Sequence, residues 1–225
     1  MKRGPAVRDE AQGLERIRRV EGGPFVPSVL YCDESLLVLE WIPSNGSSPA
    51  AEEQLGRALA ALHSAPTGEW GGGSAWIGEC PVDPFPSATA GDFYGHRLME
   101  LAGRCGLGEL VERVVGRLPS LVPPGPPVLL HGDLWWGNVL WAADGRAVLI
   151  DPSVHGGHRE EDLAMLSLFG SVPARLMEAY CEANPLDAGW EQRVDLWQLY
   201  PLLVHTVLFG GSYRRRAEAA ARRYA

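Results

Sequence analysis

Lysine is almost missing from this sequence of 225 residues. Lys and Arg together number 20, and Lys2 is the only lysine among them. They are outnumbered by 28 Asp and Glu residues, which gives a formal net charge of −8. This balance excludes a broadly basic nucleic-acid-binding protein, although it does not exclude a local basic patch. We therefore expect no nucleic acid among the partners.

Long hydrophobic runs are also missing. No apolar stretch approaches the roughly 18 residues that a membrane-spanning helix needs, and no apolar segment follows Lys2-Arg3 as it would in a secretory signal. We therefore expect no membrane partner. Hydrophobic residues nevertheless make up 46% of the chain and charged residues 21%. That composition is typical of a folded core in one large or two small domains, and not of a disordered acidic tail.

Cysteine is scarce and scattered. The four cysteines are Cys32, Cys80, Cys105 and Cys181, and no two of them form a C-x-x-C pair. This spacing does not indicate a zinc site or a disulfide-rich scaffold. Free thiols in a reducing compartment are the better interpretation, so we expect a cytoplasmic protein.

Hydrophobic periodicity predicts a small β portion, then a mostly helical portion with a β insert. Helices are expected over 6–20, 50–63, 92–118 and from about 160 to the end. Short strands are expected over 27–31, 35–41, 128–130, 138–141 and 147–150. Residues 64–91 are rich in Gly, Pro and Ser and form either a functional loop or a linker. Within them, Gly71-Gly72-Gly73 is interpreted as flexible linker, because no strand precedes it and no Gly-Lys-Ser/Thr follows.

The β insert carries the pattern that indicates chemistry. It begins His131-Gly132-Asp133, has Asn138 five residues after the aspartate, and ends a later strand at Asp151. Phosphoryl transfer needs a carboxylate to accept a hydroxyl proton and hard oxygen ligands to hold Mg²⁺. The spacing is that of the H-x-D-x-x-x-x-N motif and following strand-end Asp of kinases. The plainer alternative, two unrelated acids at strand ends, does not account for all three matches.

Specific segments resemble the fructosamine kinase family, which belongs with the aminoglycoside and choline phosphotransferases in the protein-kinase-like fold. The resemblance is carried by His131–Trp135 and Gly137–Trp141, and it extends over nearly the whole chain. Further matching segments are 38–42, 76–78, 93–98, 149–152, 157–165, 168–170, 197–200 and 208–213. The resemblance implies an α+β, two-lobed fold. Residues 1–42 would form a small, incomplete β N-lobe with the hinge, and residues 43–225 a mainly helical C-lobe.

The resemblance also implies roles in binding ATP and Mg²⁺. Asp133 would be the catalytic base, and Asn138 and Asp151 would hold the metal. Four residues would bind ATP, two through side chains and two through the hinge backbone; these are Lys2, Glu10, Glu40 and Ile42. For Lys2 an ordinary exposed position at the terminus remains the alternative.

On the substrate side, the resemblance places Trp135 against the sugar or its amine-linked group, with a core aromatic as the alternative. His155, His158 and Arg159 follow Asp151 where the substrate side of the cleft is expected, although each of them also has a structural interpretation. His131 and Asp162 are expected to support the catalytic loop.

The family's first strands and Gly-rich hairpin have no counterpart before Lys2. We expect a misplaced start of a longer protein, and a short homologue is the alternative. The implied reaction is ATP-dependent phosphorylation of a small or protein-linked ketosamine, at O3, followed by deglycation. The alternatives are another small-molecule phosphotransferase and an impaired homologue that only binds ligand. The sequence does not predict the oligomeric state.

Overall fold

The computed structural model describes all residues 1–225 as a mixed α+β fold. Its helices are α1 (Val7–Arg18), α2 (Pro49–Leu62), α3 (Ala90–Cys105), α4 (Gly108–Val115), α5 (Leu118–Leu121), α6 (Glu160–Leu166), α7 (Ala174–Ala183), α8 (Trp190–Phe209) and α9 (Ser212–Arg222). Its strands are β1 (Lys2–Arg3), β2 (Val29–Cys32), β3 (Leu36–Leu39), β4 (Trp76–Ile77), β5 (Cys80–Pro81), β6 (Val128–Leu130), β7 (Val139–Trp141), β8 (Ala147–Leu149) and β9 (His155–Gly157). No helix is both long and apolar enough to cross a membrane.

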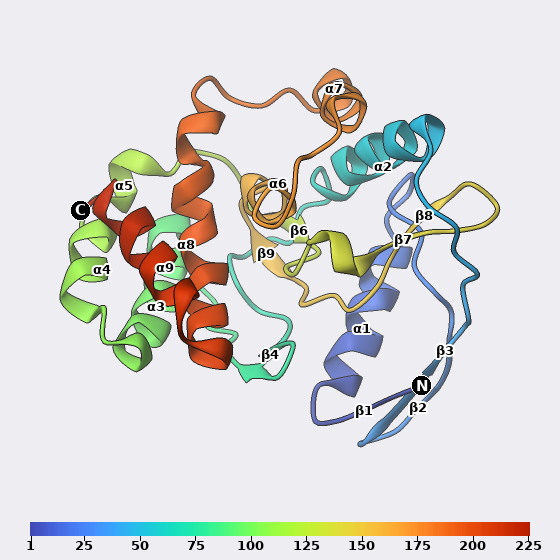
Figure 1. Ribbon diagram of the computed structural model, residues 1–225, viewed down its shortest axis with the longest axis horizontal. Coiled ribbons are helices and arrows are strands. Elements are labelled where there is room, and N and C mark those ends of the chain that lie inside the picture. The colour runs from blue at the N-terminus through green and yellow to red at the C-terminus, as the bar shows by residue number, and fades with distance from the viewer.

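A three-stranded antiparallel sheet and α1 form the N-terminal end of the molecule (Figure 1). β3 lies between β1 and β2, and Lys2 pairs with Leu37 in the register of the sheet. α1 buries Val7 against Leu37, and it buries Leu14 and Ile17 in a larger apolar cluster. Apolar residues at this spacing lie on one face of a helix. Acidic residues lie in the first turn of α1 and basic residues in the last turn, and this distribution of charge suits the helix dipole.

The β insert consists of two separate antiparallel pairs. β7 and β8 form the predicted hairpin, closed by the turn at Gly145. β6 pairs with β9, which the sequence did not predict. β9 reads His155-Gly156-Gly157, and glycine has a low strand propensity, so local pattern gives no signal there. The two pairs bring residues 131–138 and 150–155 to neighbouring strand ends.

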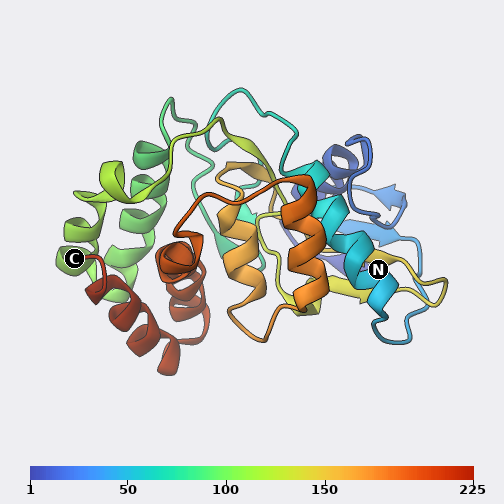
Figure 2. The same cartoon turned by 90° about the horizontal axis from the view of Figure 1, so that it is seen from above.

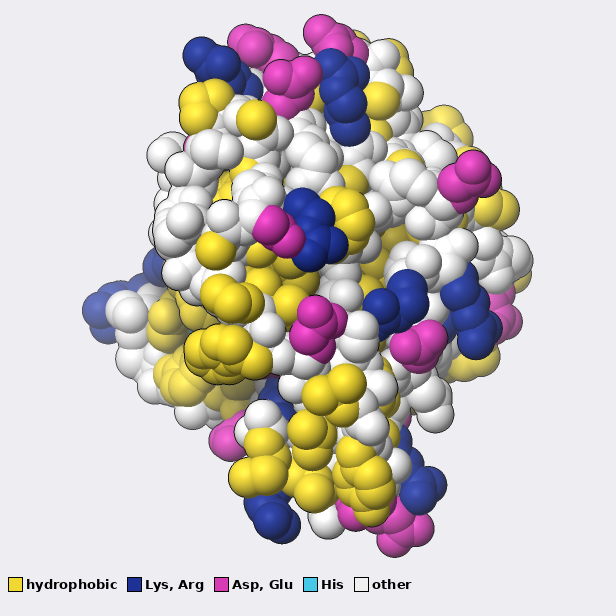
Figure 3. Space-filling model, turned by 90° about the vertical axis from the view of Figure 1, so that its right-hand side faces the viewer, with side chains coloured by type: hydrophobic (Ala, Val, Ile, Leu, Met, Phe, Trp, Pro, Cys, Tyr) yellow, Lys and Arg dark blue, Asp and Glu magenta, His cyan; other side chains and the backbone are white.

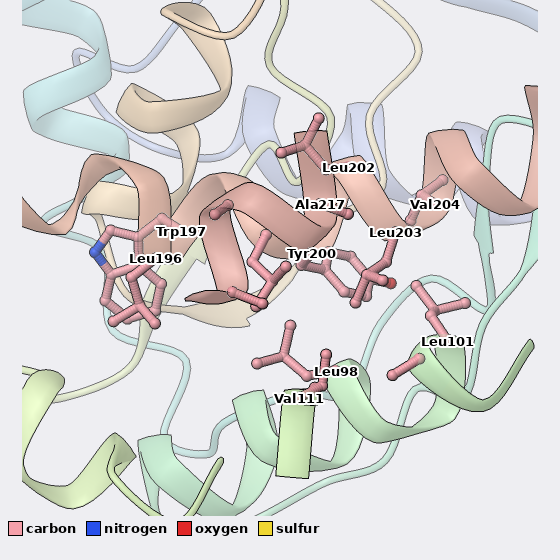
Figure 4. Close-up of a cluster of buried hydrophobic side chains, with 14 of the residues drawn as sticks. Leu98, Leu101, Val111, Leu196, Trp197, Tyr200, Leu202, Leu203, Val204 and Ala217 are labelled. Atoms are coloured by element: carbon pink, nitrogen blue, oxygen red, sulfur yellow. The ribbon is translucent and has the colours of Figure 1, made fainter. Parts of the chain in front are cut away.

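The C-terminal helices pack around a buried apolar cluster contributed mainly by α3, α4, α8 and α9 (Figure 4). Leu98 and Leu101 of α3 face Leu203 of α8, and all three are fully buried. A second cluster joins α1, α2 and α7 to the β insert. There α2 and α7 approach closely at Gly56, where a Cβ atom would lie 2.2 Å from the Leu176 carbonyl oxygen.

Two sequence predictions need correction. Residues 92–118 do not form one helix, because Gly106 adopts a left-handed conformation (φ 66°) that ends α3 before α4 begins. The Gly71–Gly73 segment is not a free linker. Gly71 exchanges two backbone hydrogen bonds with Gly156 of β9, and a Cβ atom on Gly73 would lie 2.1 Å from the Val154 carbonyl oxygen. Both glycines have positive φ angles, so glycine supplies the conformation and the close approach.

The sheet with α1 and the cluster of C-terminal helices lie at opposite ends in both ribbon views, and α6 lies between them (Figures 1 and 2). The face of the N-terminal end gathers hydrophobic side chains in its lower part (Figure 3). Exposed hydrophobic residues of the N-terminal region include Leu30, Tyr31 and Trp41. The predicted division at residue 42 stays a prediction.

Candidate active site

One small cleft brings together residues from the sheet, α1 and the β insert. It has a volume of about 40 Å³. Its lining includes four of the predicted site residues, namely Lys2, Glu10, Asp133 and Asp151. Up to 149 positions separate these residues in the sequence, and the fold places them around one opening.

Lys2 forms two ion pairs at this cleft. Its Nζ lies 2.7 Å from Glu10 Oε2 and 3.1 Å from Asp151 Oδ1. Glu10 is 3% exposed, and its Oε1 atom has no hydrogen-bond partner. Burial, reinforced by the negative charge of Asp151, raises the pKa of Glu10 to about 7, although Lys2 acts in the opposite direction. The cleft therefore concentrates two carboxylates around the only lysine of the chain.

Asp133 and Asn138 are joined directly within the loop that follows β6. Asn138 Nδ2 donates to the Asp133 carbonyl oxygen at 2.9 Å and to Asp133 Oδ2 at 3.1 Å. Burial raises the pKa of Asp133 to about 7; Asp151 adds to this, and the bond from Asn138 opposes it. A carboxylate with a pKa near neutrality is suited to accept a proton from a hydroxyl.

The side-chain oxygen atoms of Asn138, just before β7, and of Asp151, just after β8, are of the kind that fits a Mg²⁺ ion. Because the Asn138 amide nitrogen is bonded to Asp133, its Oδ1 is left as the free atom, and Ile150 N bonds to the Asn138 carbonyl oxygen at 3.1 Å. Asp151 has φ 54°, the only positive φ at a non-glycine residue. Such strain concentrates at functional sites. Carboxylate and amide oxygens are ligands that Mg²⁺ prefers. No group of three or more His, Cys, Asp or Glu side chains could hold a metal ion by itself.

Asp162 of α6 forms hydrogen bonds with the backbone of the loop that carries Asp133. The Asp162 carboxylate accepts hydrogen bonds from His131 N at 2.7 Å and from Gly132 N at 2.9 Å, and His63 Nε2 lies 3.1 Å away. His131 is fully buried, and its Nδ1 accepts a bond from Asp133 N at 3.3 Å. His131 and Asp162 therefore contact the loop backbone, in the places expected of supporting residues.

The segment that follows β3 leaves backbone groups free. Glu40 N donates to the Ser28 carbonyl oxygen, and the Glu40 side chain accepts from Ser28 N at 3.1 Å. The Glu40 carbonyl and the Ile42 N–H make no hydrogen bond within the chain. An acceptor and a donor two residues apart can bind the edge of a planar heterocycle. Asn45 N, bonded to the Trp141 carbonyl oxygen, ties this segment to the β7–β8 hairpin.

Trp135 lies on the open side of the catalytic loop. The residue is 39% exposed, and its ring covers Gly137, where a Cβ atom would lie 2.2 Å from the ring. The neighbouring Trp136 instead stacks on Trp141, with ring centroids 6.2 Å apart. Only Trp135 of this pair presents a large aromatic surface to solvent.

His155, His158 and Arg159 do not line the cleft, and their predicted place on the substrate side stays a prediction. His155 is buried, with its Nε2 2.8 Å from Arg97 Nη1. His158 is buried and stacks on Trp197. The Arg159 guanidinium bonds to the Asn184 side chain beyond α7. His155 and His158 are buried, whereas Arg159 is partly exposed and also pairs with the exposed Asp187.

The β4–β5 hairpin supplies a wall of the cleft that the sequence did not assign. Ser74, Trp76 and Gly78 line it. Asp9 of α1 accepts a bond from Ala75 N at 2.8 Å, and Ser153 Oγ donates to the Trp76 carbonyl oxygen at 2.7 Å. The Trp76-Ile77-Gly78 match noted in the sequence was the one available signal. That match did not predict a role for these residues, because the hairpin makes its contacts with residues that are distant in the sequence.

An ion-paired lysine and a strand-end aspartate line one cleft with Asp133, whose loop also carries Asn138, and this arrangement matches the residue pattern of a kinase-type phosphotransferase site. The sequence pattern of the fructosamine kinase family matches residues 3–224. A Thermus thermophilus protein assigned as a ketoamine kinase is 37% identical over 215 residues, covering 92% of this chain and 78% of that protein. A Synechocystis protein with the same assignment is 36% identical over 206 residues. This chain belongs to the fructosamine kinase family.

The comparison with Synechocystis covers 82% of this chain but 65% of the relative, so the chain spans about two thirds of that protein's length. Among solved structures, a Thermobifida fusca protein assigned as a fructosamine-3-kinase is 44% identical. It superposes with a TM-score of 0.87 over 96% of this chain and 78% of that one. A choline kinase of Streptococcus pneumoniae (14% identity, 96% of this chain, 79% of that one) and an ADP-bound aminoglycoside phosphotransferase (13%, 96% and 79%) have TM-scores of 0.63 and 0.61. They share the fold.

Proposed function

We propose that this chain transfers the γ-phosphoryl group of ATP to the O3 hydroxyl of a ketosamine, a sugar joined to an amine by glycation. The bond between the γ-phosphorus and its bridging oxygen breaks, a bond from O3 to phosphorus forms, and ADP leaves. The phosphorylated product then sheds the sugar and frees the amine, so the biological outcome is deglycation. The observation that supports this most is the convergence of Lys2, Glu10, Asp133 and Asp151 on one cleft.

Asp133 is proposed as the catalytic base. It takes the proton of the O3 hydroxyl as the oxygen attacks phosphorus. Its raised pKa of about 7 suits this exchange, and the two bonds from Asn138 fix its orientation. Trp135, exposed beside it, is proposed to stack on the sugar or its amine-linked group.

Lys2 is proposed to hold the ATP phosphates, and Glu10 to orient Lys2. Asn138 and Asp151 are proposed as the Mg²⁺ ligands, and Mg²⁺ when bound neutralises phosphate charge. The free Glu40 carbonyl and Ile42 N–H are proposed to bind adenine. On this basis residues 1–42 serve mainly the nucleotide, and residues 43–225 serve catalysis and the acceptor. A cytoplasmic location is proposed from the reducing environment that four free cysteines suit.

The test is ADP release by the purified chain with ATP and Mg²⁺ and a panel of acceptors. The panel contains fructosyl-lysine, ribulosyl-lysine, choline and an aminoglycoside. We expect turnover with a ketosamine, no turnover with EDTA present, and phosphorus on O3 by NMR. Turnover only with choline or the aminoglycoside would contradict the ketosamine assignment. Saturable ketosamine binding without any ADP release would show a ligand-binding homologue instead.

A further inference from the structure

An aromatic surface continues outward from Trp135 across the junction of α8 and α9. We call it the α8–α9 aromatic surface; its members are Phe169, His205, Phe209 and Tyr213. The Trp135 and Phe169 ring centroids lie 5.9 Å apart, and Phe169 lies 5.1 Å from His205 and 6.3 Å from Tyr213. Phe209 contacts His205 and Tyr213 at 5.6 and 6.0 Å. The five rings thus form one connected set.

These five rings are partly exposed to solvent, unlike the side chains of a hydrophobic core. Phe209 is 65% exposed and Phe169 36%. Exposed aromatic residues that contact one another mark binding sites more often than isolated ones do. The set begins two residues after Asp133, so it continues the proposed acceptor side of the active site.

Arg216 adds a positive charge at the edge of this surface. Its guanidinium carbon lies 6.0 Å from the Phe169 ring centroid. One nitrogen, Nη2, donates to the Leu168 carbonyl oxygen at 3.2 Å, which fixes the group, and no acidic side chain pairs with it. A guanidinium held in this way keeps further N–H donors for a carboxylate.

We propose that the α8–α9 aromatic surface binds the amine-bearing part of the ketosamine, with the aliphatic arm and its cationic ammonium on the aromatic faces and a carboxylate on Arg216. The proposal rests on the proposed function and names the substrate class more closely. The class is ketosamines of amino acids or peptides in which several methylene groups separate the amine from a carboxylate.

Such a substrate carries one positive and one negative group, and the surface offers a partner for each: aromatic rings for the cationic amine and Arg216 for the carboxylate. A ketosamine nitrogen is a secondary amine that is protonated near neutrality, and cations are attracted to aromatic faces. Phe169 neighbours both Trp135 and Arg216, at separations of 5.9 and 6.0 Å. We therefore infer that the arm crosses the Phe169 ring, which takes several methylene groups between the amine and the carboxylate.

The experiment compares three fructosamines that share one sugar. Their amines are 6-aminohexanoate, its amide 6-aminohexanamide, and methylamine. For the unaltered chain we expect the lowest KM with 6-aminohexanoate. Arg216→Gln should raise that KM about tenfold, which corresponds to one charge-assisted contact, and should leave the amide and methylamine substrates unchanged. Phe209→Ala should raise the KM of both long-armed substrates about threefold, in the range of a cation–π contact.

Arg215→Gln is the matched control, because Arg215 is the adjacent exposed arginine and makes no ion pair. It should behave as the unaltered chain with all three substrates. Equal KM values for the acid and the amide in the unaltered chain would overturn the carboxylate contact. Equal loss with methylamine in the Phe209 variant would show a structural effect and overturn the arm site. Absence of turnover with every fructosamine would instead reject the proposed function itself.

Discussion

Lys2 Nζ lies 2.7 Å from Glu10 Oε2, so the only lysine of the chain is paired with a nearly buried glutamate of α1. Lys2→Gln removes the sole cation at the cleft that could hold phosphates. We expect kcat/KM for ATP to fall about 100-fold, the loss typical of one electrostatic contact in an active site. Steady-state kinetics with a ketosamine acceptor will measure it.

The control for Lys2 is Arg8→Gln, which removes the ion pair of Arg8 with Glu34 on the surface nearby. Exposed pairs contribute little, so this variant should retain full activity and stability. Similar losses in the two variants would contradict a specific role for Lys2.

Asp133→Asn tests the base. The substitution preserves shape but removes the acceptor of the hydroxyl proton, so kcat should fall by about 10²- to 10⁴-fold. Binding of the ketosamine, followed by calorimetry, should change little. Asp144→Asn, in the exposed turn of the β7–β8 hairpin, is the matched control and should keep its kcat. A kcat above a tenth of the original value in the Asp133 variant would rule out general-base catalysis by this residue.

The proximity of the residues in the predicted active-site loop follows from local geometry. Asp133 and Asn138 belong to one loop, and the β7–β8 hairpin carries Asp151 back to them. The fold class also followed, since the resemblance covered most of the chain and solved family structures superpose on it. Lys2 and Glu10 meet because β1 precedes α1 directly.

Contacts between residues that are distant in the chain had no signal in the sequence. His155 follows Asp151 closely, yet its partner Arg97 comes from α3, 58 residues away. A single sequence carries no local signal for such a contact. The cleft wall formed by the β4–β5 hairpin was missed for the same reason, since its anchor Asp9 belongs to α1. Burial of polar groups is decided by nonlocal packing, which periodicity does not reveal.

Gly137→Ala tests the position of Trp135. Its Cβ atom would lie 2.2 Å from the Trp135 ring, so the ring must move from its place beside the loop. We expect the KM for the ketosamine to rise about tenfold with a smaller change in the KM for ATP, as loss of one aromatic contact with the substrate implies. Gly103→Ala is the control, because nothing lies within 4 Å of its Cβ position in α3. It should be neutral or slightly stabilising. Unchanged ketosamine KM in the Gly137 variant would show that Trp135 does not contact substrate.

Asp162→Ala tests the support of the catalytic loop. It leaves His131 N and Gly132 N without their acceptor and removes the partner of His63. Breaking a buried charged network from one side costs about 3–5 kcal/mol, so urea unfolding should show a loss of that order. Asp187→Ala is the control, since Asp187 is exposed and pairs only at the surface. It should change the free energy of unfolding by less than about 1 kcal/mol. A small loss in the Asp162 variant would mean that water replaces the carboxylate.

The stability of the fold should depend on pH through His158. Burial lowers the pKa of His158 below 6.5, and its Nδ1 accepts a bond from Glu160 N at 3.3 Å, which requires the unprotonated nitrogen. The unfolded chain takes up a proton near pH 6.5 that the folded chain excludes. His158 therefore stabilises the fold fully above that pH, and the contribution is lost as the pH falls below it, by up to about 1.4 kcal/mol per pH unit.

His158→Phe keeps a ring to stack on Trp197 but cannot titrate. It will be less stable than the unaltered chain at pH 8, because Glu160 N loses its acceptor. The difference in free energy of unfolding should shrink as the pH falls from 7 to 5, since only the unaltered chain loses the His158 contribution. His96→Phe, at a partly exposed position on α3, is the control and should show no comparable narrowing. A difference that stays constant or widens toward pH 5 would mean that the folded protein accommodates a protonated His158.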